Sequence, residues 1–178
     1  LAGVRAQAIT QDVTGGAGER IVRGVVAQRP PRGTGAAPEI GRPPYDVVIA
    51  DQFLSQLLYP ALADAGVTGR ALDGALRAHG QSLTNAVVAG LLRAGALVVC
   101  VEDVLGWWEG RTQPFTVEDV LAAAPEEQLA LLERGTPARG CNGRLALTAA
   151  GATVVDRAFW HWPFAAGTDY LVCATVAR

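Results

Sequence analysis

The sequence contains no methionine and no lysine, so all 15 of its basic residues are arginine. Without lysine the chain cannot form a Schiff base, and it cannot carry the lysine of a phosphate-binding loop. Because the chain starts at Leu1 rather than at a methionine, we expect it to be a processed product or a piece of a longer protein.

The chain also has few cysteines and histidines and little net charge. The three cysteines cannot make a closed disulfide framework, and no Cys/His spacing is typical of a metal site, so we expect a cytoplasmic protein without a metal. A net charge of −2 gives no electrostatic footprint for nucleic acid or an anionic membrane. The most apolar stretch, residues 83–101, contains Asn85 and Arg93, which favours a buried helix and strand over a membrane span. No targeting segment is visible.

Half of the 178 residues are hydrophobic, which fits a single domain with a sizeable core. Residues 14–44 are rich in glycine, proline and arginine and predict a long irregular loop. Strands are expected over residues 4–13, 45–51, 97–101, 153–160 and 170–176. Helices are expected over residues 52–65, 71–78, 83–93, 116–124 and 126–134.

This order predicts an α/β fold with a mainly parallel sheet and helices on both of its faces. The last two strands have no helix between them, so we expect them to form an antiparallel pair at the end of the sheet. Ligands bind outside the carboxyl ends of strands in open parallel sheets. Polar residues follow four expected strands there: Asp12, Asp51 with Gln52, Glu102 with Asp103, and the region of His161 and Trp162.

The same order resembles the later two-thirds of a class I (Rossmann-like) S-adenosylmethionine-dependent methyltransferase. Residues 4–13 (VRAQAITQDV) are similar to that family's third strand, and residues 45–54 (YDVVIADQFL) to its fourth. Residues 92–99 (LRAGALVV) resemble its turn into the fifth strand, and residues 151–160 and 169–177 resemble its closing antiparallel pair. The family's glycine-rich loop would lie upstream of Leu1, so we expect weak cofactor binding; residues 12–18 (DVTGGAG) resemble that loop only superficially.

The resemblance implies S-adenosylmethionine as cofactor and methyl transfer to an oxygen or nitrogen of a small or medium-sized molecule. It places the cofactor against Asp12, Val13, Asp51, Gln52 and Phe53. His161 is the candidate general base, with Asp51 as a second catalytic candidate. The acidic pair and the clustered tryptophans would bind a flat substrate; they are Glu102, Asp103, Trp107, Trp108 and Trp162.

Structural alternatives remain open for each of these residues. Asp12 could stabilise a turn and Asp51 could cap a helix, while the tryptophans could fill a core and His161 could be hydrogen-bonded in place. A non-catalytic interaction domain, a homo-oligomer, and a hydrolase using Ser55 or Ser82 with His161 are the competing hypotheses. No Gly-x-Ser-x-Gly elbow supports the hydrolase.

Overall fold

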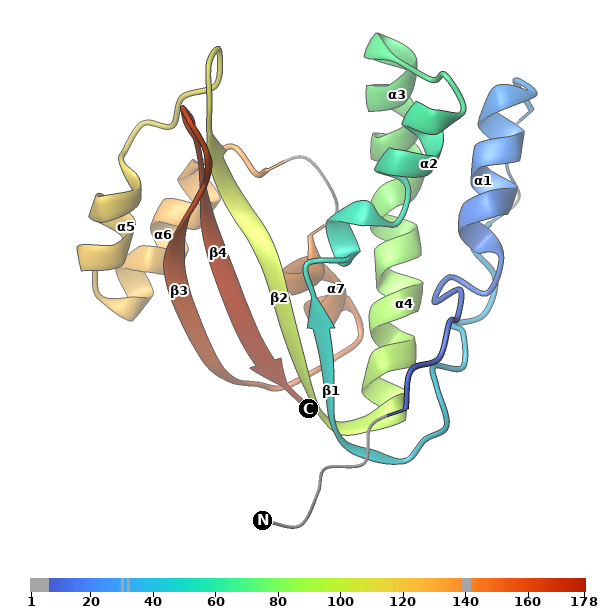
Figure 1. The fold of residues 1–178 in the computed structure, drawn as a ribbon. Coiled ribbons are helices and arrows are strands. Elements are labelled where there is room, and N and C mark those ends of the chain that lie inside the picture. Colours follow the sequence, from blue (N-terminus) through green and yellow to red (C-terminus); the bar gives the residue numbers. More distant parts are fainter. Residues whose placement is uncertain (1–6, 30, 32, 139–141) are drawn as a thin grey trace.

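Four strands form one open sheet in the computed structural model, which describes residues 7–29, 31, 33–138 and 142–178 (Figure 1). They are β1 (Tyr45–Asp51), β2 (Gly95–Trp107), β3 (Val154–Ala165) and β4 (Thr168–Ala177), in the spatial order β1-β2-β4-β3. β1 and β2 are parallel, whereas β4 is antiparallel to both β2 and β3. The expected closing pair is therefore confirmed. The expected mainly parallel sheet is wrong, because two of the three strand pairings are antiparallel.

Seven α-helices accompany the sheet in the described residues: α1 (Ala17–Val26), α2 (Tyr59–Asp64), α3 (Gly69–Ala75), α4 (Gln81–Ala94), α5 (Val117–Ala122), α6 (Pro125–Arg134) and α7 (Gly143–Ala149). Short turns of other helix types follow β1 (Leu54–Gln56) and α3 (Leu76–Gly80). None of these helices combines the length and apolar character needed to cross a membrane.

The N-terminal region differs from the expectation in two ways. Residues 7–12 are irregular, so the predicted strand over residues 4–13 is absent where the structure describes it, and residues 4–6 lie outside the described part. The expected irregular stretch over residues 14–44 contains α1, whose ten residues bury Ala17 and Ile21. The high arginine and glycine content of this segment hid its helical spacing of apolar residues.

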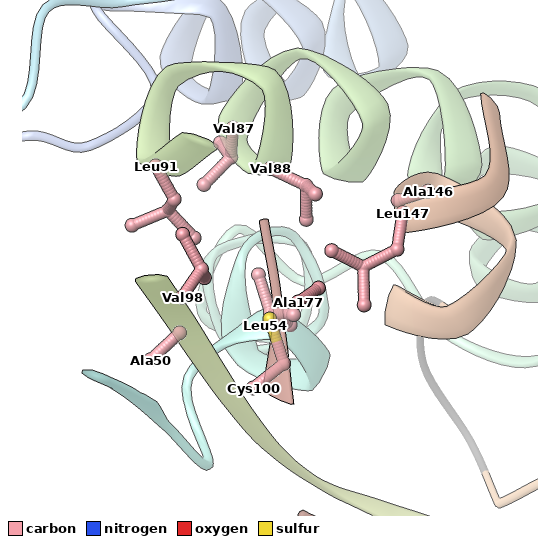
Figure 2. Close-up of a cluster of buried hydrophobic side chains, with 10 residues drawn as sticks. All are labelled: Ala50, Leu54, Val87, Val88, Leu91, Val98, Cys100, Ala146, Leu147 and Ala177. Atoms are coloured by element: carbon pink, nitrogen blue, oxygen red, sulfur yellow. The ribbon is translucent and has the colours of Figure 1, made fainter. Parts of the chain in front are cut away.

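The main core lies between the sheet and the helices α4 and α7 (Figure 2). The sheet contributes Ala50, Val98, Cys100 and Ala177, and Leu54 lies just after β1. The helical residues of this cluster are Val87, Val88 and Leu91 from α4, and Ala146 and Leu147 from α7. A second cluster joins α1, α2, α3 and the start of α4, so these helices form a layer of their own around Leu62 and Leu83.

The third cluster packs α5 and α6 onto the far end of the same sheet face. Leu105 of β2 and Leu171 of β4 contact Val120 and Leu131 there. The helices α4 and α7 and the pair α5 and α6 therefore all pack on the same face of the sheet. The prediction of helices on both faces is not met by the described helices.

The opposite face of the sheet is open in the described structure, and we call it the uncovered face. Side chains alternate along a strand, so the neighbours of the core residues point to this side. Its most exposed apolar members are between 36% and 66% accessible: Tyr45, Val47, Ile49, Trp160, Trp162 and Phe164. The apolar runs of β1 and β2 predicted burial on both faces, because such runs do not reveal whether a second layer is present.

A β-bulge near the end of β2 changes which residues face the core. Asp103 pairs with Val172 and Leu105 pairs with Leu171, which leaves Val104 as the extra residue. Before the bulge Val98 and Cys100 point into the core, and after it Leu105 does. Asp103 is the last residue before the bulge, so it follows the alternation of Val99 and Val101 and lies on the uncovered face beside the end of β1.

Candidate functional site

A cavity of about 370 Å³ lies at the carboxyl ends of the parallel strands β1 and β2. β2 and its end contribute Asp103 and Trp108, and β4 contributes Tyr170. The segment after β1 supplies further polar groups on the other side. The described lining is Ser55, Gln56, Tyr59, Asp103, Trp108, Ala138 and Tyr170.

Gln52 and Asp103 form the polar edge of this cavity. Gln52 follows β1 with a φ of +56°, a left-handed conformation that costs a non-glycine residue energy and often occurs at functional sites. Its backbone N–H donates to the carbonyl oxygen of Val101 at 3.0 Å, which holds the turn against β2. Burial raises the pKa of Asp103, and hydrogen bonding from the Gln52 side chain opposes that rise. Oδ1 of Asp103 is buried and has no hydrogen-bond partner among the described residues.

Four aromatic rings contact one another at this end of the sheet, and Trp108 and Tyr170 among them line the cavity with Asp103. We call the group the aromatic wall: Trp108, Trp162, Phe164 and Tyr170. Ring centroids lie 6.1 Å apart for Trp108 and Tyr170, and 6.2 Å apart for Trp162 and Tyr170. Phe164 meets Trp162 edge-on at 5.2 Å. Gly106 lies under this group, and a Cβ there would be only 2.4 Å from a Trp108 ring carbon, so a larger residue would displace the wall.

Arg111 holds the outer end of the aromatic wall in place. The central carbon of its guanidinium group lies 4.6 Å from the centroid of the Trp108 ring, a cation–π arrangement. The same guanidinium donates to the carbonyl oxygens of Thr136 and Pro137. Arg111 therefore connects Trp108 to the chain segment that leads to Ala138, and it does not line the cavity itself.

Several residues expected from the sequence meet at this cavity. Asp103 and Trp108 line it, Gln52 adjoins it, and Trp162 belongs to the aromatic wall. Asp51 ends β1 opposite Val101 and is exposed at the same end of the sheet. Ser55, a candidate only in the hydrolase hypothesis, lines the cavity, and no sequence pattern indicated Gln56 or Tyr59. Tyr170 could have been found, because a hairpin between the last two strands places it opposite Trp162.

Glu102 points to the opposite side of β2 from Asp103, although the two are adjacent in the sequence. Its side chain points into the core, where the residue is 5% exposed. Its Oε2 accepts the N–H of Gly143 at 2.7 Å and its Oε1 accepts the N–H of Arg144 at 3.2 Å, so the carboxylate holds the start of α7. Burial raises the pKa of Glu102, and the two backbone hydrogen bonds oppose the rise.

His161 lies on the helix-covered face, away from Asp51. Its Nε2 is 2.7 Å from Oδ1 of Asp169, and both residues line a groove with Trp107 and Phe115. The indole N–H of Trp107 donates to the carbonyl oxygen of Phe115 at 3.2 Å, which makes Trp107 part of the packing in this region. The two catalytic candidates His161 and Asp51 therefore lie on opposite faces of the sheet.

Asp12 stabilises the turn before α1, which is the structural alternative to a role in cofactor binding. Its carboxylate accepts the N–H and the hydroxyl of Thr14 at 2.8 and 2.7 Å, and the N–H of Gly16 at 2.6 Å. Partial burial raises the pKa of Asp12, but these hydrogen bonds and the charge of Arg20 together hold it below its ordinary value. Val13 and Phe53 pack against the main core. Of the five expected cofactor residues, only Gln52 interacts with a residue that lines the cavity, and Asp51 precedes it in the chain.

The remaining alternatives are also placed by the structure. Ser55 lines the cavity, and the hydroxyl of Ser82 lies 3.4 Å from that of Thr34, so neither serine shares a site with His161. Within residues 7–29, 31, 33–138 and 142–178, no three His, Cys, Asp or Glu side chains gather closely enough to hold a metal ion. Comparison with protein-family models, curated proteins and solved structures found no match.

Proposed function

We propose that this domain transfers a methyl group from S-adenosylmethionine to an oxygen or nitrogen of a small or medium-sized molecule in the cavity. The observation that carries the proposal is the position of Gln52 and Asp103. A strained polar turn and a half-buried carboxylate meet at the carboxyl ends of two parallel strands, beside an aromatic-lined cavity. This is where open α/β sheets bind their ligands.

The strand arrangement supports the proposal. The segments that resemble the family's fourth and fifth strands are β1 and β2, which are parallel neighbours. The segments that resemble its closing strands are β3 and β4, which form an antiparallel pair. These pairings agree with the expected order of elements, whereas the expected third strand is absent over residues 7–12.

The cofactor residues fit in part. Asp51 and Gln52 would hold the cofactor at the rim, whereas Asp12, Val13 and Phe53 are engaged in the turn before α1 and in the core. When bound, S-adenosylmethionine supplies an electrophilic methyl group on a sulfonium centre. Asp103 would accept a hydrogen bond or a proton from the acceptor molecule, and the aromatic wall would orient that molecule and exclude water.

Calorimetry with S-adenosylhomocysteine tests the proposal on the 178-residue chain. We expect weak but saturable binding that is lost in Gln52→Ala. Gln28→Ala is a matched control, because Gln28 also has a positive φ, of +52°, but lies at the end of α1. Binding that is equal in both variants, or absent at millimolar ligand, would overturn the proposal.

A non-catalytic domain that pairs with a second copy of itself is the second candidate. It is favoured by the uncovered face, whose six exposed apolar residues leave on the order of 600 Å² of apolar surface. That is at the upper end for a monomer, where the largest patch is roughly 300–600 Å². It is also close to the ~800 Å² that each partner contributes to a standard interface. A methyltransferase assay and a measurement of mass in solution separate the two candidates.

A further inference from the structure

We infer that the cavity selects a flat molecule with a protonated nitrogen, so that the methyl acceptor is an arylalkyl amine, which would give a proton to the Asp103 carboxylate before its nitrogen lone pair attacks the methyl group. That the bound molecule accepts a methyl group rests on the proposed function. The preference for a cation rests on the cavity alone. Its basis is the chemistry of the described lining: one carboxylate, three aromatic rings and no basic side chain.

The aromatic rings favour a positive charge. Tyr59, Trp108 and Tyr170 all line the cavity, and Trp162 and Phe164 continue the aromatic wall from Tyr170. The faces of such rings carry partial negative charge, which attracts a cation, and the attraction strengthens when the cation is desolvated. The same rings offer flat apolar surface for an aryl group.

Asp103 supplies a complementary group for the charged end of the ligand. It is the only carboxylate in the described lining, and it lies next to Trp108 and Tyr170. An ammonium group within hydrogen-bond distance would form a charge-assisted hydrogen bond with it. A ligand carboxylate or phosphate in the same position would be repelled.

Arg111 lies beside Trp108 without lining the cavity, and its guanidinium makes contacts within the protein. It stacks on Trp108 and donates to the carbonyl oxygens of Thr136 and Pro137. A cavity of about 370 Å³ falls at the lower end of the range for small-molecule sites, roughly 300–1,000 Å³, which suits a single ring with a short side chain.

Three matched probes test the selectivity on the full chain without cofactor: phenethylamine, 2-phenylethanol and 3-phenylpropionate. They share one ring and differ mainly in the charge of the polar end. By calorimetry we expect the amine to bind at least about tenfold more tightly than the carboxylate, a difference equal to about 1.4 kcal/mol. Equal binding, tighter binding of the carboxylate, or no binding of any probe overturns the inference.

Substitutions assign the selectivity to the cavity. Asp103→Asn should abolish the preference for the amine, whereas Asp46→Asn, at the exposed opposite end of β1, should keep it. Gln56→Lys is a second variant that does not touch the core, because Gln56 is exposed at the cavity. It should weaken binding of the amine and strengthen binding of the carboxylate. If the preference survives in both cavity variants, the inference is wrong.

A second readout separates this inference from the proposed function. Formation of S-adenosylhomocysteine is measured with each probe in the presence of S-adenosylmethionine. Selective binding of the amine without any methyl transfer supports the cation-selective cavity and contradicts the methyltransferase. Methyl transfer to the alcohol but not to the amine supports the methyltransferase and contradicts the inferred acceptor.

Discussion

The variant Glu102→Gln tests whether burial or hydrogen bonding has the larger effect on the stability of the protein with a charged carboxylate at this position of β2. Glu102 is 5% exposed and accepts two backbone N–H groups from the start of α7. Its raised pKa means that burial disfavours the charged form more than the two hydrogen bonds favour it. Glutamine has the shape of the protonated acid, with one acceptor oxygen and one donor group, so it is a neutral reference for the same site.

The sign of the pH dependence follows from the raised pKa. A carboxyl group whose pKa is higher in the folded state binds more protons there, so its contribution to stability is greatest below the unfolded value of about 4.3. That contribution falls as the pH rises through the folded pKa. Wild type and Glu102→Gln should therefore be equally stable near pH 4. At higher pH the variant should be the more stable, by about 1.4 kcal/mol for each unit by which the pKa is raised.

Urea unfolding followed by circular dichroism measures this difference at about pH 4 and about pH 8. Glu109→Gln is the control, because Glu109 is exposed just after β2 and should change stability by no more than about 0.5 kcal/mol. If Glu102→Gln is less stable than wild type near pH 8 by about 1–3 kcal/mol, the two N–H groups outweigh burial and the reasoning is refuted.

Four further variants test a helix cap, two glycine positions and the uncovered face. Thr116→Ala removes a capping box in which the Thr116 hydroxyl and the Asp119 carboxylate each accept a backbone N–H, so urea unfolding should show a loss of about 1 kcal/mol; no loss would mean that α5 does not need its cap. Gly143→Ala should destabilise by about 1–3 kcal/mol, because its Cβ would lie 2.9 Å from a buried carboxylate oxygen. Gly74→Ala has open space within α3 and should instead stabilise by up to about 1 kcal/mol, and the reverse order would contradict the close approach at α7. Ile49→Glu, on the uncovered face, should reduce self-association in analytical ultracentrifugation, and an unchanged mass distribution would count against pairing through that face.

The elements with strong local signals were predictable from the sequence. The run of β-branched residues over Tyr45–Asp51 gave β1 with its observed bounds, and Thr116 with Asp119 gave the start of α5. The closing hairpin followed from the lack of room for a helix between its strands. Each of these depends on neighbours in the chain, which is the information that a single sequence carries.

The features that depend on long-range packing could not be predicted in the same way. Whether a second layer covers the sheet is not recorded in β1 or β2, so the uncovered face was missed. Tyr59 reaches the cavity only because α2 folds back beside the end of β2. The sequence could have predicted that Glu102 and Asp103 point to different sides of the sheet, because adjacent residues of a strand point to opposite faces.

The bulge divides β2 into two segments that differ in whether even-numbered or odd-numbered residues face the core, and the cavity lies where the two segments meet. Upstream of Val104 the even-numbered residues face the core, and downstream the odd-numbered ones do. Deleting Val104 would remove the extra residue without turning any side chain over, because Asp103 and Leu105 already pair with the neighbouring residues Val172 and Leu171 of β4. The packing of α5 and α6 on Leu105 should therefore survive this deletion, whereas the local bend and twist of the bulge would be lost. Deleting Val101, at a regular position before the bulge, would instead turn Glu102 to the uncovered face and Asp103 into the core. In a library of variants, loss of Val104 should be tolerated better than loss of Val101.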